Sequence, residues 1–401
     1  SAPPATSNAW NIRTLADFLN PSNGFVNAAT KINNKPSDPN QLVSVPNDSR
    51  YHFSDDKYQR LNGQAIVQFK PTDALTITAD ALFARTLQDE QRSDESNWFN
   101  RPFDVVTFDS NKAVATTTYL HETIAGVKDT GFEQQARAQK NQLEDYGLNA
   151  KWDIAHNFTL TIDGHYGKSS VLPNNSNGTS STLVGLGANV ITAHSVDYSG
   201  QIPVQDISIS DASIPGGNHN GVLDVNDVGS SIGRTYTTSQ RQKVKEIRAD
   251  FGWDLGGGSR FDFGGLYRDT DTNQQLTSTQ QTLGNWSVDF PGDVQKIAPG
   301  VLKDFCLLCK FNSYDPKGTG PNLIAFRGDA LTLYNALSSS YAAKGNAVSI
   351  TASQNNTVKE TIYAGYGQVT WKGEIAGHNA TLVAGARYEH TKDEAISLQA
   401  V

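Results

Sequence analysis

The sequence lacks several features that define common protein classes. It has no methionine, only two cysteines, and no stretch that approaches the ~18 uninterrupted apolar residues of a transmembrane helix. It also contains no GxSxG, HExxH or phosphate-binding loop, and its histidines are scattered rather than set at ligand spacing from cysteines or carboxylates. These absences argue against a helical membrane protein and against an enzyme.

Positive charge is also scarce. The 401 residues carry a net charge of -8, and the sequence pI is about 5.5, so nucleic acid is not an expected partner. The chain opens without an initiator methionine, a basic n-region or an apolar h-region, so we expect that it starts neither at an initiator methionine nor with a signal peptide.

What the sequence does contain is a hairpin pattern that occurs four times. A run of alternating apolar and polar residues leads into a tight turn, and a second alternating run leads back out. In the first copy Leu61, Ala65, Val67 and Phe69 share one face of the run. This period of two and the β-branched content predict strands rather than helices. The hairpins are expected near 58–86, 144–168, 243–270 and 358–392, with long loops near 87–143, 170–242 and 271–357.

Aromatic residues lie near both ends of the predicted strands. One set flanks the tight turns and the other lies near the opposite strand ends. They are, respectively, Phe69, Trp152, Phe158, Trp253, Phe261 and Trp371, and Phe83, Tyr146, Tyr166, Tyr267, Tyr363 and Tyr388. Two such belts match the aromatic girdles of a transmembrane barrel at the membrane–water interfaces.

These patterns predict an all-β protein, a transmembrane antiparallel β-barrel with about eight strands in this chain and long extracellular loops. A soluble β-sandwich is the alternative, but it would place its turns every 8–12 residues. Small barrels do not normally carry such long loops, so we expect residues 1–401 to form one partial barrel domain, a slice of a larger barrel.

The chain resembles the TonB-dependent outer-membrane receptors of Gram-negative bacteria. The resemblance lies in the run Arg50–Ser54, in Arg60–Ala65 and in Phe69–Thr76, which are similar to mid-barrel segments of large proteobacterial receptors. It implies a 22-stranded barrel in the cell outer membrane, in contact with lipid and lipopolysaccharide. It also implies import of a scarce small-molecule nutrient, such as a siderophore or a carbohydrate.

The family also implies an N-terminal plug domain through which the TonB complex energises transport. We expect neither the plug with its TonB-contacting segment nor the closing C-terminal strand within residues 1–401. Coupling to TonB is therefore implied by the resemblance alone. A passive porin-like channel and a surface-exposed adhesin or structural β-protein are the alternative functions.

The second long loop contains a candidate calcium site. Asn218, Asn220, Asp224 and Asp227 fall at positions three, five, nine and twelve of a calcium-loop pattern, and oxygen ligands at this spacing suit Ca²⁺. Position one, normally an aspartate, is Gly216, which favours an Asn/Asp-rich turn without an ion.

Aromatic residues among polar ones mark a candidate nutrient site in the loops. Trp98, Phe99 and Arg101 lie together in the first loop, and Trp286 lies in the third. Exposed rings could stack on a sugar or an aromatic chelate, with hydrogen bonds around them. The alternative is that these rings pack the loops against one another.

The remaining candidates are structural. Cys306 and Cys309 form a CxxC motif without a second ligand pair, so a local disulfide is favoured over a zinc or redox site. Arg248, Arg268 and Arg387 are expected on the face of the strands that would line the barrel. They could line a polar pathway or pair with Asp250, Asp262 and Glu389, and salt-bridged lining is favoured.

Overall fold

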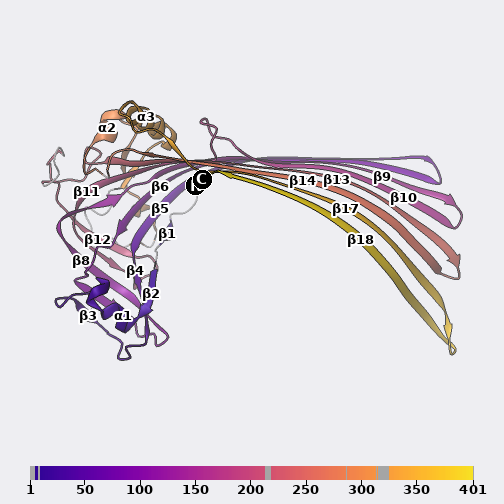
Figure 1. Cartoon of the computed structure of the whole chain (residues 1–401), viewed down its shortest axis with the longest axis horizontal. Coiled ribbons are helices and arrows are strands. Elements are labelled where there is room, and N and C mark those ends of the chain that lie inside the picture. The colour runs from indigo at the N-terminus through magenta and orange to yellow at the C-terminus, as the bar shows by residue number, and fades with distance from the viewer. Residues whose placement is uncertain are drawn as a thin grey trace.

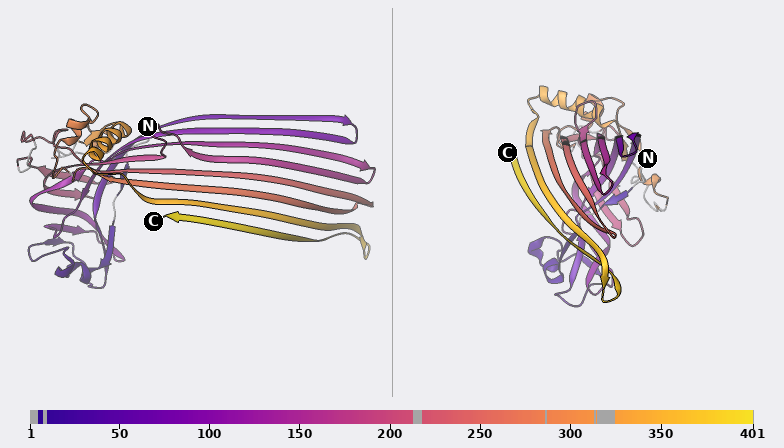
Figure 2. Two further views of the ribbon diagram at one scale, coloured as in Figure 1. Left: turned by 45° about the horizontal axis from the view of Figure 1, so that its top comes forward. Right: turned by 90° about the vertical axis from the view of Figure 1, so that its right-hand side faces the viewer.

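The computed structural model describes residues 5–7, 10–212, 218–285, 287–312, 314 and 325–400. Within them the protein is all-β apart from short helices, as the alternating pattern predicts. It consists of a long ladder of strands and a compact cap at one end of it (Figure 1). In the two views of Figure 2 the ladder remains a single layer beyond the cap.

Eight long antiparallel strands form the ladder. They are β5 (Asp48–Thr72), β6 (Leu75–Trp98), β9 (Gln134–Ala155), β10 (Phe158–Pro173), β13 (Gly229–Gly256), β14 (Ser259–Thr282), β17 (Ser349–Ile375) and β18 (His378–Ala400). They pair in the order β5-β6-β9-β10-β13-β14-β17-β18.

Tight turns join the strands at the end of the ladder away from the cap. Gly257 and Gly258 follow β13 with φ of 60° and 80°, and Ala376 and Gly377 follow β17 with φ of 51° and 79°. Two successive residues in the left-handed region are typical of the type I′ turns that match the twist of paired strands.

The strands run well beyond the predicted hairpins at the other end. For example, β5 and β6 pair from Asp48 and Trp98 down to Thr72 and Leu75, whereas the alternating pattern indicated only 58–86. Toward the cap, both faces of each strand become polar, and the ladder continues there. Hydrophobic alternation therefore marks only the half of the ladder nearest the tight turns, here called the lower ladder; the half nearest the cap is the upper ladder. Much of what the sequence assigned to loops is therefore strand.

Register divides the lower ladder into two chemically distinct faces. The apolar face includes a row that runs from strand to strand across the whole ladder: Phe69, Ile77, Ala150, Ile162, Ala249, Gly265, Gly365 and Tyr388. Many of its large side chains are exposed, with Val67 66% and Leu382 62% accessible, and others, such as Ile77 and Phe251, are half-buried. The opposite face, here called the polar face, carries hydrophilic and charged side chains.

The cap is built from the segment that precedes β5 and from the connections between the ladder strands, together with the strand ends they pack against. Its elements are β1 (Ala5–Ser7), β2 (Trp10–Thr14), α1 (Leu15–Leu19), η1 (Pro21–Asn23), β3 (Lys31–Asn33), β4 (Leu42–Pro46), β7 (Val105–Phe108), β8 (Val114–Gly131), β11 (Ser181–Asp197), β12 (Val204–Ile209), α2 (Asp293–Ile297), β15 (Lys303–Phe305), η2 (Leu308–Lys310), β16 (Ala325–Arg327) and α3 (Ala330–Ala343).

Strand β11 links the cap to the ladder. Residues 181–187 pair with the upper part of β13, and residues 187–197 pair with β8. Ser181–Val184 also pair with the top of β9. The cap is thus hydrogen-bonded into the upper ladder rather than tethered to it by loops.

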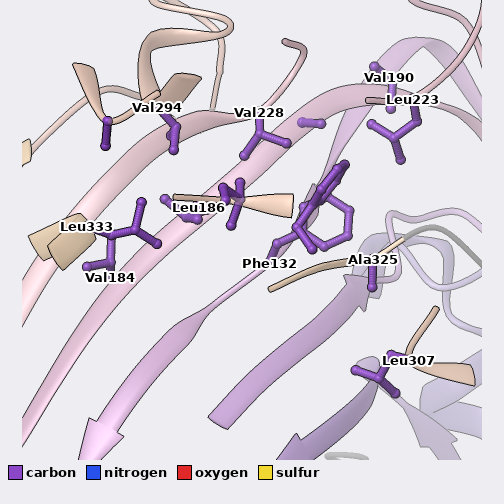
Figure 3. Packing of buried hydrophobic residues seen from close by; sticks show 14 of the residues in the cluster. Phe132, Val184, Leu186, Val190, Leu223, Val228, Val294, Leu307, Ala325 and Leu333 are labelled. Carbon is purple, nitrogen blue, oxygen red and sulfur yellow. The ribbon is translucent and has the colours of Figure 1, made fainter. Parts of the chain in front are cut away.

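Two hydrophobic cores hold the cap together. In the helix core, Leu333 of α3 and Val294 of α2 lie around Val184, Leu186 and Phe132 (Figure 3). The tip core joins the N-terminal segment to the first long connection and includes Phe18, Phe25, Val43, Phe103, Val106 and Leu120.

Candidate functional site

Ion pairs line the polar face at the level of the apolar band. Arg248 Nε lies 2.6 Å from Asp250 Oδ2, and Arg387 Nη2 lies 2.6 Å from Glu389 Oε2, as the sequence suggested. Arg268 instead pairs with Glu246 on the neighbouring strand at 2.5 Å. Cross-strand register, which the sequence alone does not supply, sets this last pairing.

A hollow of about 460 Å³ lies on the same face, between β13, β17 and β18. Arg248, Tyr366, Gln368 and Arg387 line it. The Tyr366 hydroxyl donates a hydrogen bond of 2.7 Å to Asp250 Oδ1. Because both arginines already pair with carboxylates, the wall of this hollow is polar without a strong net charge.

Nearer the cap, three further hollows form a continuous trough on the polar face. Their volumes are about 340, 230 and 470 Å³. The first two share Val171 and Gln240, and the last two share Thr238. We call this feature the amide trough, since its side chains include Gln88, Gln139, Asn141, Gln240, Gln274 and Gln354.

Several amides of the trough are unpaired within the part of the chain that the structure describes, although Gln135 and Gln142, which also line it, are hydrogen-bonded to Ser181 and Glu144. Gln88 faces Gln139 across β6 and β9, and Gln240 faces Gln274 across β13 and β14. None of these four side chains makes a hydrogen bond to another described residue. The Asn141 Oδ1 atom is buried and likewise has no partner there.

Charge is nearly absent from the trough. Among the described residues that line it, only Glu90, Arg137 and Tyr236 are ionisable. Arg137 Nη1 lies 3.6 Å from Glu90 Oε2, so the two charges offset each other. The Tyr236 side chain is 41% accessible and leaves an aromatic ring beside the polar wall.

The aromatic residues predicted to bind a ligand lie elsewhere. Trp98 ends β6 and is 37% accessible, but Phe99 is only 8% accessible and belongs to the tip core. The Phe99 ring stacks on His194 with centroids 4.6 Å apart and meets Phe103 edge-on. Phe99 is therefore a packing residue. Consecutive side chains of an extended segment point to opposite sides, so Trp98 stays partly exposed while Phe99 is buried.

Arg101 also contributes to packing in the tip of the cap. Its guanidinium carbon lies 3.7 Å from the centroid of the Phe25 ring, and that of Arg13 lies 3.9 Å from the same centroid. Burial and the nearby Arg13 charge lower the pKa of Arg101. Trp286, the remaining predicted ligand contact, lies outside the described residues.

The candidate calcium loop is held by hydrogen bonds of its own. The Nδ2 atoms of Asn218 and Asn220 each donate to Asp224 Oδ2 at 2.8 Å, and the Asp224 backbone N–H donates to Asp227 Oδ2. Burial acts to raise the pKa of Asp224, but the bonds from Asn226, Asn220 and Asn218 outweigh it and lower the pKa.

These contacts correspond to an Asx-rich turn. Gly216, at the first position of the pattern, lies outside the described residues. No group of three or more histidine, cysteine or acidic side chains able to hold a metal ion occurs among the residues that are described.

Cys306 and Cys309 form a disulfide with a Cα–Cα distance of 5.3 Å. Leu307 and Leu308, which the bond encloses, are both buried in the helix core. The disulfide therefore fixes a short turn whose side chains anchor the third long connection.

The interior of the cap holds ionisable groups that the sequence did not single out. Glu95 is 1% accessible, and Gln205 Nε2 donates a hydrogen bond to its Oε1 atom. Burial raises the pKa of Glu95 to about 8. His194 is fully buried, and burial lowers its pKa to about 4.

The amide trough was missed as well, although a signal for it exists. Its glutamines lie at every second position of the strands, on the same polar face as the hydrophilic residues of the hairpins, and between the apolar segment and the cap. Extending the alternation past the last apolar residue of each strand would have placed them on one face.

Comparison with protein-family models and with curated proteins finds no match to this chain. In the described residues, no helix has both the length and the apolar character needed to span a membrane.

Proposed function

We propose that the ladder is part of a β-barrel in the outer membrane of a Gram-negative bacterium, and that the chain belongs to an energised nutrient receptor of the TonB-dependent type. The cap would stand on the extracellular side and capture a scarce nutrient, which then passes along the polar face. Energy would come from the TonB complex through a plug, as the family resemblance implies.

The observation that carries this proposal is the exposed apolar band on one face of all eight ladder strands. On β10 it runs from Phe158 to Tyr166, which are nine residues of strand. At a rise of about 3.4 Å per residue and a tilt of about 40°, that length covers roughly 23 Å, close to the ~25 Å apolar band of outer-membrane barrels.

The band also ends abruptly on the side toward the cap. One register row of this face carries a charged residue on each of six adjacent strands: Glu144, Lys168, Lys243, Asp271, Lys359 and Glu394. Such a row is costly inside hydrocarbon but suits the headgroup level, where lipid phosphates and water are available.

The edges of the ladder support a larger barrel. Among the described residues, β18 pairs only with β17, and β5 has a second partner only at residues 50–52, opposite β1. Unpaired backbone groups cost several kcal/mol each in hydrocarbon, so a spanning sheet must close on itself. Further strands would therefore have to join these two edges.

The proposal is tested by tryptophan quenching in vesicles. The full chain is reconstituted in vesicles of lipids brominated at defined depths, using variants that keep either Trp152, Trp253 and Trp371 or Trp10 and Trp98. We expect strong quenching of the first set and none of the second. Equal quenching of both sets, or a chain that stays soluble without detergent, would overturn the membrane assignment.

A passive porin-like channel is the second candidate, because the polar face with its ion pairs would also suit a water-filled pore. The two functions differ in their energy requirement. Uptake that a protonophore abolishes in intact cells supports the energised receptor, whereas uptake that persists supports the channel.

A further inference from the structure

The amide trough indicates which class of nutrient the proposed receptor takes. We propose that it binds an uncharged, polyhydroxylated chain, that is, a neutral oligosaccharide, rather than an anionic metal chelate. This inference rests on the proposed function, because it assigns the ligand of the same polar pathway.

The first argument is the hydrogen-bonding chemistry of the wall. A carboxamide offers two donors and an acceptor in one plane, so a single glutamine can bind two neighbouring hydroxyl groups. Gln88, Gln139, Gln240, Gln274 and Gln354 make no side-chain hydrogen bond to other described residues, so all of this capacity faces the trough. Asn141 adds a buried acceptor without a partner in the described chain.

The second argument is charge. A ferric chelate that carries negative charge would be recognised by arginine and lysine side chains, which form charge-assisted hydrogen bonds to anions. Arg137, the one cation among the described residues that line the trough, already pairs with Glu90. The lysines nearest in register, such as Lys168 and Lys243, lie on the opposite face of the ladder.

The third argument is shape. The trough crosses β6, β9, β10, β13, β14 and β17, which at about 4.8 Å between neighbouring strands makes a length of roughly 24 Å. An elongated ligand with repeated units would meet an amide on each of these strands except β10, which contributes Ser169, Ser170 and Val171. The exposed ring of Tyr236 on β13 supplies a flat apolar surface for the face of a sugar ring.

The test is calorimetric titration of the full chain in detergent. The probes are maltohexaose, laminarihexaose and xylohexaose as neutral chains, and ferric citrate as an anionic chelate. We expect at least one neutral hexaose to bind and ferric citrate not to bind. In the double variant Gln240→Leu/Gln274→Leu, affinity for that hexaose should fall at least tenfold.

The matched control is Gln59→Leu, which removes an exposed glutamine from the opposite face of β5 at a position that lines none of the hollows. It should change affinity less than twofold. Folding of each variant is checked by its heat-modifiable migration. A second variant, Tyr236→Ala, should also weaken binding and leaves every amide in place.

Binding of ferric citrate alone, binding of none of the hexaoses, or hexaose affinity unchanged in the double variant would each overturn the inference. The vesicle experiment is scored separately on the same preparations. A chain that inserts in vesicles but binds no hexaose loses only the assigned ligand class, whereas a chain that does not insert contradicts the proposed function itself.

Discussion

The ammonium group of Lys128 forms an ion pair with the carboxylate of Glu122 inside the cap, where the two side chains are 6% and 1% accessible. Lys128 Nζ also donates to the backbone oxygen of Trp98, and His194 Nδ1 lies 3.3 Å from Glu122 Oε1. Burial acts to lower the pKa of Lys128, and the Glu122 charge opposes this effect. The pair joins the end of β6 to β8 and β11.

Removing one partner of this pair should destabilise the cap strongly. We expect Lys128→Met to cost about 3–5 kcal/mol of unfolding free energy, because Glu122 would be left buried without a compensating charge. The double variant Lys128→Met/Glu122→Gln should recover much of that loss. The measurement is thermal unfolding of the cap in detergent, followed by near-ultraviolet circular dichroism. A single variant within 1 kcal/mol of the parent would contradict the prediction.

Glu95 should make the cap less stable as pH rises. Its folded-state pKa of about 8 lies above the ordinary value of 4.5, so the folded protein holds a proton that the unfolded chain releases. The resulting stabilisation is full below pH 4.5 and is lost as pH rises through 8, by up to about 5 kcal/mol.

The check is to compare Glu95→Gln with the parent between pH 4.5 and 8.5. The variant should gain stability relative to the parent as pH rises, because its amide does not ionise. Histidine effects, including that of His194, are common to both proteins and cancel in the difference. A difference that stays flat over this range would show that Glu95 titrates normally.

The lower ladder was predictable from the sequence, and the cap was not. Alternation is visible near Leu148 and Phe261 because only one face of each strand is apolar. In the cap, β11 is buried along most of its length, and the buried positions of β8 alternate with half-buried ones. Both strands carry buried polar residues, such as Glu122 and His194, so no apolar–polar period of two appears in the sequence. Their partners are also remote in sequence, and local pattern carries no information on such pairing.

The candidate site divides along the same line. Salt-bridged lining of the polar face follows from the parity of residues such as Arg248 and Arg387. Phe99 is buried because its side of the β6 end faces the tip core. The tip core forms only when the cap assembles, so the sequence alone could not predict this burial. The trough glutamines obey the rule that every second residue of a strand lies on the same face. They lie beyond the last apolar residue of each strand, however, so the hydrophobic pattern alone gave no reason to continue the strands that far.

An arginine on the apolar face should impair insertion, whereas one on the polar face should not. Leu148 is 58% accessible within the apolar band, and Leu148→Arg should cost about 2–4 kcal/mol of folding free energy in a bilayer. Thr161→Arg, on the polar face and next to Asp250 in register, is the matched control and should cost less than 1 kcal/mol. Urea titration in vesicles with the gel-shift readout measures both.

Gly229 should not tolerate a side chain, because the backbone of the third long connection passes directly over it. A Cβ atom there would lie 2.4 Å from Ser287 Cα and 2.7 Å from Ser287 N. Ser287 is itself fully buried and donates a hydrogen bond of 2.6 Å to the backbone oxygen of Asp227, so it has little room to move. We expect Gly229→Ala to lower cap stability by about 2 kcal/mol or more through overpacking.

Gly63→Ala is the control, since a Cβ at Gly63 meets nothing within 4 Å, and it should leave the unfolding midpoint unchanged. Equal midpoints for the two variants would mean that the connection does not hold this position over β13.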